Sequence, residues 1–109
     1  MSASEADWKN FRQLRELALE RFCKRTLDEL QPILDNASRT YHDRYLEVFR
    51  VLNARDDVLA DAFNNPRRSD MMRQLLVIVG LGLAEPGELD RFSEGTRSTI
   101  DRFIQREGS

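Results

Sequence analysis

The chain has a single histidine, His42, which limits the metal chemistry that helical proteins commonly perform. A di-iron or di-manganese carboxylate centre needs a Glu-x-x-His pair on each of two helices. Position 39 holds an arginine rather than an acid, and Glu47 falls on a different helical face from His42. We therefore exclude this class of metalloenzyme. A pH-sensing or general-base role for His42 is conceivable, but we favour a histidine at or near the surface beside a polar neighbour.

The single cysteine, Cys23, excludes an intramolecular disulfide and a cysteine-based zinc site. Because Lys24 and Arg25 follow it, Cys23 could act as a nucleophile. It also lies on or beside the apolar stripe of the first helix, where cysteines are mostly packed and inert, and we favour that interpretation. The Gly80-Leu81-Gly82 segment lacks a third glycine and ends a helix, whereas phosphate binding needs a helix beginning. We expect no cofactor, no metal and no catalytic residue.

Arg67, Arg68 and Arg73 are the candidate contacts for nucleic acid or another anion. They fall in segment 56–75, where a short helix, an Asn-Asn-Pro turn and a second helix have the lengths of a helix-turn-helix. However, the second helix becomes wholly apolar after Gln74, and a recognition helix needs an exposed polar face. Nucleic acid is therefore a possible partner but not the favoured one.

The position of Arg67 and Arg68 still requires an explanation. Two cations at the beginning of a helix oppose the helix dipole by several tenths of a kcal/mol each. Their position therefore indicates either an anionic partner or pairing with Asp61, Asp70 or another acid of the chain.

Tyr41 and Tyr45, with His42 between them, could line a small pocket between helices, where helical bundles often bind ligands. The alternative is structural. Residues 41 and 45 are neighbours on one helical face, and their rings could point inward with the hydroxyl groups at the edge of the core.

The first helix has a wide apolar face, which raises the question of self-association. Trp8 and Phe11 begin this face, and Leu17 and Leu19 widen it to nearly half of the helix circumference. Such a face is typical of a deeply inserted helix or of a helix at a dimer interface. We expect a homodimer in which Trp8, Phe11, Leu17 and Leu19 contribute to the interface.

The composition is that of one globular domain of 109 residues. The net charge is −2, from 17 basic and 19 acidic residues that are interspersed along the chain. This balance argues against bulk attraction to nucleic acid or to an anionic membrane. The N-terminal residues lack the pattern of a signal peptide, so we expect a cytoplasmic protein, and a bacterial source fits the arginine-rich composition.

Apolar residues recur every three to four positions along the chain, which predicts helices and no strand. Ser4 should begin the first helix, and the Thr26 to Glu29 capping-box pattern either starts a second helix or lies inside a long one. Pro32 should kink the chain or open a new helix near residues 28–31, and that helix should continue to Leu52.

A break is predicted at residues 53–56, followed by a short helix that ends at Phe63. Asn65 and Pro66 should then begin the helix that carries nine residues without a polar side chain, 75–83, and Ser69-Asp70 is a second candidate start. Gly82 is its expected left-handed terminal residue, with Leu83 folded back onto the last turn. Pro86 should open the next segment, and residues 93–96 should begin the last helix.

We therefore predict a single helical domain over residues 1–109, a compact all-α bundle of five to six helices around a buried central helix at about 67–82. The favoured function is a non-catalytic interaction or regulatory module, a homodimer that also binds an unidentified protein. One alternative is a DNA- or RNA-associated regulator that uses segment 56–75. A second alternative is a small-ligand-binding protein or enzyme with a pocket near Tyr41, His42 and Tyr45. No membrane partner is expected.

Overall fold

The computed structural model describes residues 3–107. Within that range the chain forms five α-helices and one short 3-10 helix, and it contains no strand. The elements are α1 (Glu5–Leu34), α2 (Tyr41–Phe63), η1 (Arg68–Asp70), α3 (Met71–Gly80), α4 (Pro86–Leu89) and α5 (Glu94–Glu107). The predicted all-α class and the number of helices are confirmed.

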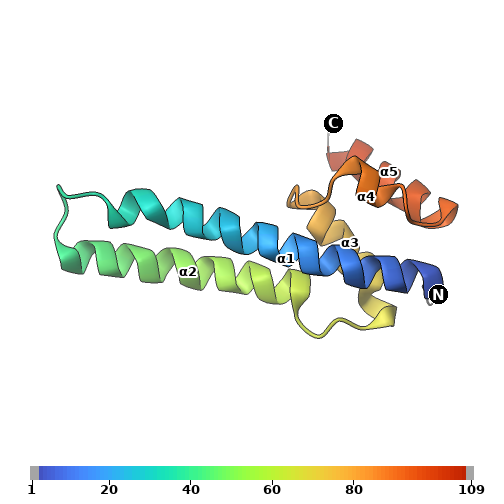
Figure 1. Ribbon diagram of the computed structural model, residues 1–109, viewed down its shortest axis with the longest axis horizontal. Helices are drawn as coiled ribbons and strands as arrows, with labels where there is room; N and C mark the ends of the chain where they lie inside the picture. The colour runs from blue at the N-terminus through green and yellow to red at the C-terminus, as the bar shows by residue number, and fades with distance from the viewer. Residues whose placement is uncertain (1–2, 108–109) are drawn as a thin grey trace.

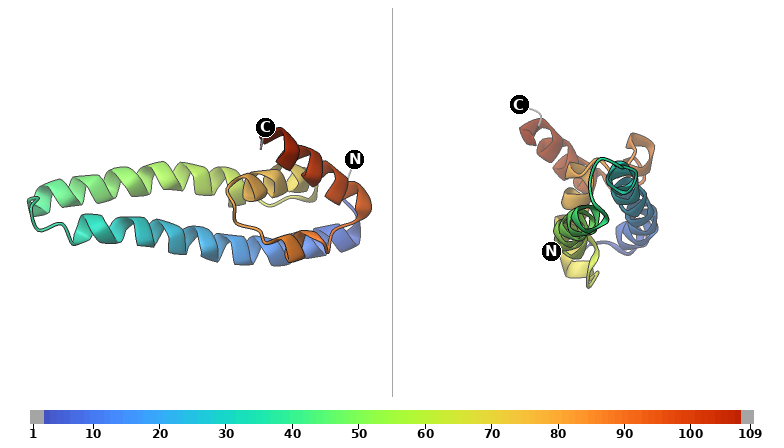
Figure 2. Two further views of the ribbon diagram at one scale, coloured as in Figure 1. Left: turned by 90° about the horizontal axis from the view of Figure 1, so that it is seen from above. Right: turned by 90° about the vertical axis from the view of Figure 1, so that its left-hand side faces the viewer.

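The molecule is elongated, because α1 and α2 form a long antiparallel hairpin and the other helices gather at one end of it (Figure 1). Two further views show the far part of the hairpin extending away from α3, α4 and α5 (Figure 2). The molecule measures 53 × 30 × 19 Å, with a radius of gyration of 16.8 Å. A compact chain of this length would have a radius of gyration of about 13 Å. The bundle is therefore compact only at the α3 end.

Helix α1 begins at Ser4, as predicted, because the Ser4 hydroxyl accepts a hydrogen bond of 3.1 Å from the Asp7 backbone N–H. Apolar residues then return to the buried face every three or four positions as far as Leu30. Thr26 is buried inside this helix and does not begin a second one. The new helix predicted as one alternative near residues 28–31 does not form, because Pro32 removes one backbone hydrogen bond only two residues before α1 ends.

The predicted continuation of this helix to Leu52 is wrong, because the chain reverses at residues 35–40. The Asn36 side chain accepts hydrogen bonds from the Ser38 backbone N–H at 3.2 Å and from its hydroxyl at 2.5 Å. The Thr40 hydroxyl accepts one of 3.0 Å from the Asp43 backbone N–H and so caps α2. Side chains that bond the local backbone in this way stabilise a turn over a continuous helix.

Helix α2 does not break at residues 53–56, contrary to the prediction. The segment contains no proline or glycine, and Arg55 forms a paired hydrogen bond with Glu29 of α1, with N–O distances of 3.0 and 2.8 Å. This contact between helices holds the middle of α2 against α1. Residues 56–63 are therefore the last two turns of a long helix rather than a separate short one.

Helix α3 is the central helix of the compact end, since it packs against α1, α2 and α5. Leu75 and Ile78 are fully buried, as predicted, while Leu76 and Val79 are half-buried against the same core. The helix begins at the second candidate start, with Asp70 at the N-cap position, and not at Asn65, because Asn65 adopts a positive φ of 49° and the chain stays extended at Arg67. Its end is as predicted: Gly82 has φ 71°, and the Leu83 N–H returns to the Ile78 carbonyl at 3.2 Å.

The hydrophobic core lies almost entirely at the α3 end of the molecule. Its cluster of buried residues consists of Phe11, Leu14, Ala18, Phe22, Ala62, Phe63, Met71, Leu75, Ile78, Leu83, Phe92 and Ile100. Helix α2 is described in full, and its only buried residues are Ala62 and Phe63, at its end. The far part of the hairpin is thus a pair of helices with little core of its own.

Candidate functional site

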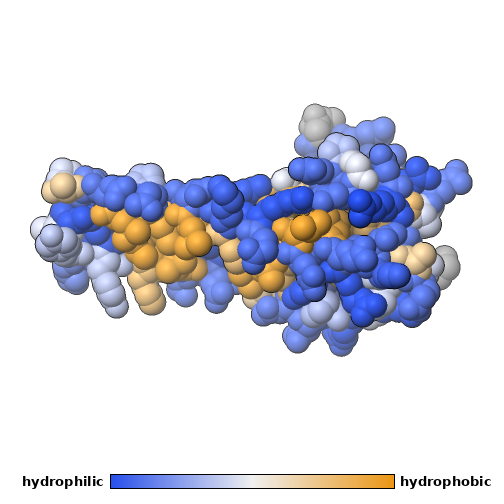
Figure 3. Space-filling model, in the orientation of Figure 1, coloured by the Kyte–Doolittle hydropathy of each residue, from blue (hydrophilic) through white to orange (hydrophobic). Residues whose placement is uncertain are grey.

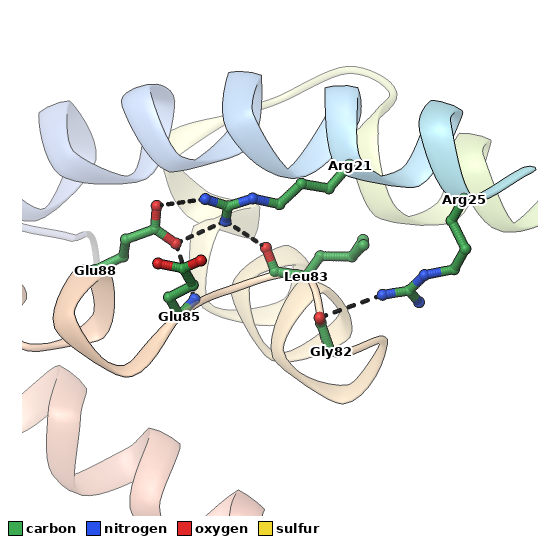
Figure 4. Close-up of polar contacts among 6 residues, drawn as sticks. All are labelled: Arg21, Arg25, Gly82, Leu83, Glu85 and Glu88. Atoms are coloured by element: carbon green, nitrogen blue, oxygen red, sulfur yellow. Dashed lines mark hydrogen bonds and ion pairs between the residues drawn. The ribbon is translucent and has the colours of Figure 1, made fainter. Parts of the chain in front are cut away.

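Arginines of α1 fix the neighbouring helix ends in place. Arg21 forms a paired hydrogen bond with Glu88, at 2.7 and 2.9 Å, and donates to the Leu83 carbonyl at 2.8 Å (Figure 4). Arg25 donates to the Leu81 and Gly82 carbonyls, at 2.7 and 3.3 Å. These bonds satisfy carbonyl groups of the turn that follows α3, which have no helical partner. The hydrogen bond from Arg21 also lowers the pKa of Glu88, so both partners stay charged.

Arg67, Arg68 and Arg73, the predicted anion contacts, each bind an acid of the same chain. Arg67 pairs with Asp70 at 3.1 Å, and Arg73 pairs with Asp61 at 3.3 Å. Arg68 pairs with Glu5 at 3.0 Å and donates to the Ala3 carbonyl at 3.0 Å. Their position beside a helix beginning is therefore accounted for within the chain and no longer argues for an anionic partner.

Segment 56–75 contains the end of α2, a linker that includes η1, and the beginning of α3. Gln74 is buried and donates a hydrogen bond of 2.8 Å to the Asn64 carbonyl, which ties the linker to α3. The first turns of α3 are thus used in holding the fold together.

The predicted dimer residues do not form one surface. Phe11 is fully buried in the chain's own core, with its ring stacked on Trp8 at a centroid distance of 5.7 Å. Trp8 and Leu19 pack against the same core. Leu17 alone is open, at 47% exposure, and its helical neighbours Gln13 and Glu20 are polar and exposed. The wide apolar face of α1 is therefore that of an inserted helix along its first half.

Tyr41 and Tyr45, the predicted pocket residues, line one depression of about 510 Å³ at the far end of the hairpin, whereas His42 does not. The depression is lined by Leu34, Tyr41, Arg44, Tyr45, Val48, Phe49 and Leu52. The tyrosine rings do not point into a core, because Tyr41 is 84% exposed and Tyr45 is 68% exposed. Arg44 lies over the Tyr41 ring at 4.5 Å and donates to the Leu34 carbonyl at 2.8 Å, which joins α2 to the end of α1.

A second depression of about 310 Å³ continues the first toward the core, and Leu52 belongs to both. Its lining consists of Phe22, Cys23, Thr26, Leu27, Leu52, Arg55, Asp56 and Leu59. We call the two together the hairpin groove. The space-filling view shows the apolar patch that they form on the outer part of α1 and α2 (Figure 3).

The chain matches no family model, no curated protein and no solved structure. Function must therefore be inferred from the surface of the molecule itself. Within residues 3–107, no group of three or more His, Cys, Asp or Glu side chains is placed to hold a metal ion. None of the described helices combines the length and the apolar character that a membrane span requires.

Sequence reasoning missed most of the hairpin groove, including Leu27, Leu34, Phe49 and Leu52. The sequence does contain a pattern that indicates the groove. Residues that line it from α2 recur at positions 41, 45, 48, 52, 55 and 59. These alternating steps of four and three residues are the spacing of a helix that packs along a neighbour. The apolar spacing alone predicts one helix across residues 35–40, and a groove between two helices follows only from the reversal there.

Proposed function

We propose that this protein is a helical interaction module and that the hairpin groove is its binding surface. The observation that carries the proposal is the exposure of large apolar side chains on the outer hairpin, above all Tyr41, Tyr45 and Phe49. Single exposed apolar residues are ordinary, but contiguous patches of this kind mark interaction sites.

The physical reason is the lack of core in this part of the fold. Two helices alone cannot bury their apolar faces against each other completely, and bundles do so by adding further helices. Helix α2 turns one face to α1 through Arg44 and Arg55, and its adjacent face carries the groove. A helical partner in the groove would give both helices of the hairpin a second neighbour.

A small apolar ligand is the second candidate, because a depression of about 510 Å³ has the size of a ligand pocket. Ligand pockets, however, enclose most of the ligand and place several polar groups around it. Arg44 and the two tyrosine hydroxyls supply the polar groups here, and the groove is open along its length. An extended apolar partner fits this shape better than an enclosed small molecule.

We do not propose nucleic acid as a partner. Arg67, Arg68 and Arg73 each pair with an acid of the same chain, and these pairs account for their positions.

Site-specific crosslinking tests the proposal. A photoreactive residue at Tyr45, in the groove, should give a crosslinked product of higher mass when the full chain is irradiated in its own cells. The matched control is Leu46, which is 49% exposed on the same helix but does not line the groove. A product at Tyr45 and none at Leu46 is expected. Failure to crosslink at either position, or equal products at both, would reject the groove as a binding surface.

A further inference from the structure

We propose that the hairpin groove binds a second copy of this chain, so that two hairpins pack face to face into a four-helix bundle. This inference rests on the proposed function, because it names the partner of the same groove.

The exposed apolar area supplies a large part of what a stable dimer needs. Tyr41, Tyr45 and Phe49 are 84%, 68% and 61% exposed, which leaves roughly 400 Å² of aromatic surface open to solvent. The groove leucines, Leu27, Leu34 and Leu52, are 63%, 51% and 43% exposed and extend this open surface along the hairpin. A stable interface buries about 800 Å² per partner, whereas the largest apolar patch of a typical monomer is about 300–600 Å².

The helical register suits a second hairpin of the same kind. On α2 the groove residues follow steps of four and three, from Tyr41 through Val48 and Leu52 to Leu59. On α1 the positions 23, 27, 30 and 34 hold Cys, Leu, Leu and Leu at the same steps, and three of these four residues line the groove. Helices with such repeats pack as in four-helix bundles, where each helix has two neighbours. A two-fold pair of hairpins provides this arrangement with one surface used twice.

The charge of the groove favours a copy over a partner of opposite charge. Its only charged residues are Arg44, Arg55 and Asp56, and Arg55 is already paired with Glu29 at 2.8 Å. The net charge of the whole chain is −2, so two copies repel each other weakly. The groove thus has no strong field that would select an acidic or basic partner, and its mostly apolar lining suits the same lining on a second copy.

Sedimentation equilibrium of the purified full chain tests the inference. The wild type should have twice the chain mass of 12.7 kDa at tens of micromolar. Tyr45→Glu and Phe49→Glu should each raise the dissociation constant at least about a hundredfold, since each leaves an unpaired charge in an apolar interface. Both residues are exposed in the single chain, so the monomer should keep its helical circular dichroism spectrum.

Two control variants locate the interface. Leu46→Glu, at a 49% exposed position outside the groove, and Leu17→Glu, on the polar side of α1, should change the dissociation constant by less than about threefold. The inference is overturned if either control dissociates the dimer as fully as Tyr45→Glu does. It is also overturned if the wild type sediments at 12.7 kDa up to about 100 μM, or if the assembly contains more than two chains.

Failure of this inference is distinguishable from failure of the proposed function. A wild type that is monomeric but crosslinks at Tyr45 to a different protein contradicts the second copy and leaves the groove as a binding surface. Binding of the wild type, but not Tyr45→Glu, to phosphatidylglycerol vesicles would likewise replace the second copy with a lipid surface. A monomer that gives no crosslink at Tyr45 rejects both proposals.

Discussion

At the scale of single residues, the arginines of this chain bind acids and carbonyl oxygens of the chain itself. Arg15 donates two hydrogen bonds to the Phe63 carbonyl at the end of α2, and Arg21 and Arg25 donate to carbonyl groups of the turn after α3. A guanidinium group can hold two acceptors in fixed geometry, which lysine cannot. The arginine-rich composition is therefore used in part to join helices whose ends would otherwise leave carbonyl groups unsatisfied.

Asp7 makes a comparable junction between α1 and α5. Its carboxylate accepts hydrogen bonds from the Ser93 N–H at 2.8 Å, the Ser93 hydroxyl at 2.6 Å and the Thr96 hydroxyl at 2.7 Å. Burial raises the pKa of Asp7, but the hydrogen bonds from Ser93 and Thr96 together outweigh it and leave the pKa below its ordinary value of 3.8. A lowered folded-state pKa means that the ionised group stabilises the fold above about pH 4, and this contribution is lost as the pH falls through the folded pKa.

Asp7→Asn should therefore lower the free energy of unfolding by ~1–3 kcal/mol at neutral pH and by less at about pH 3. Urea unfolding at the two pH values measures this difference. Asp57→Asn, at an exposed position of α2, is the control and should change stability by less than about 0.5 kcal/mol. An equal loss for Asp7→Asn at both pH values would show that the carboxylate charge does not contribute.

A substitution at Leu75 tests whether α3 is the central helix of the core. Leu75→Ala should cost ~2–5 kcal/mol of unfolding free energy, because the side chain is fully buried and its removal leaves a cavity. Leu76→Ala, at the half-buried neighbouring position, should cost clearly less. Chemical denaturation at one fixed protein concentration compares the two. A Leu75→Ala loss below ~1 kcal/mol would contradict the central position of α3.

At the scale of helices and turns, the end of α3 depends on the left-handed conformation of Gly82. A Cβ atom at Gly82 would find space, with Arg25 Nη2 nearest at 3.9 Å, but the φ of 71° disfavours any other residue. Gly82→Ala should therefore cost about 1–2 kcal/mol through backbone strain alone. Gly87→Ala, inside α4 with no atom near its Cβ position, should be neutral or slightly stabilising. Equal thermal shifts for the two variants would contradict this account of the turn.

The limits of sequence-based prediction are also clearest at this scale. Ser4, Gly82 and the apolar periodicity of α3 were interpreted correctly, because each depends on local backbone chemistry or on one helical face. The reversal at residues 35–40 was missed, because it depends on the Asn36 and Thr40 hydrogen bonds while the apolar spacing continues across it.

The groove could not be predicted without that reversal, because it forms between two helices. Once α1 and α2 are known to be antiparallel, Leu27 and Leu34 lie on the same side of the hairpin as Tyr45 and Leu52. The partners of Arg67, Arg68 and Arg73 were partly foreseen in Asp61 and Asp70. Glu5 was not predicted as a partner of Arg68, because it lies more than sixty positions away along the chain.

At the scale of the whole molecule, one end is a packed bundle and the other is a hairpin with an uncovered apolar face. The α3 end buries its core with helices from every part of the chain, and the outer hairpin has only α1 and α2. Helices without tertiary cover are marginally stable in water, so the outer hairpin should be the first part to open. A second copy in the groove would stabilise this part in particular.

Amide hydrogen exchange tests this central claim most directly. Residues 24–33 and 42–52 should exchange slowly in the wild type at tens of micromolar and at least tenfold faster in Tyr45→Glu, while α3 exchanges at the same rate in both. Leu46→Glu should behave as the wild type does. Equal exchange of the outer hairpin in the wild type and in Tyr45→Glu would contradict the account, because the groove would then be uncovered in solution.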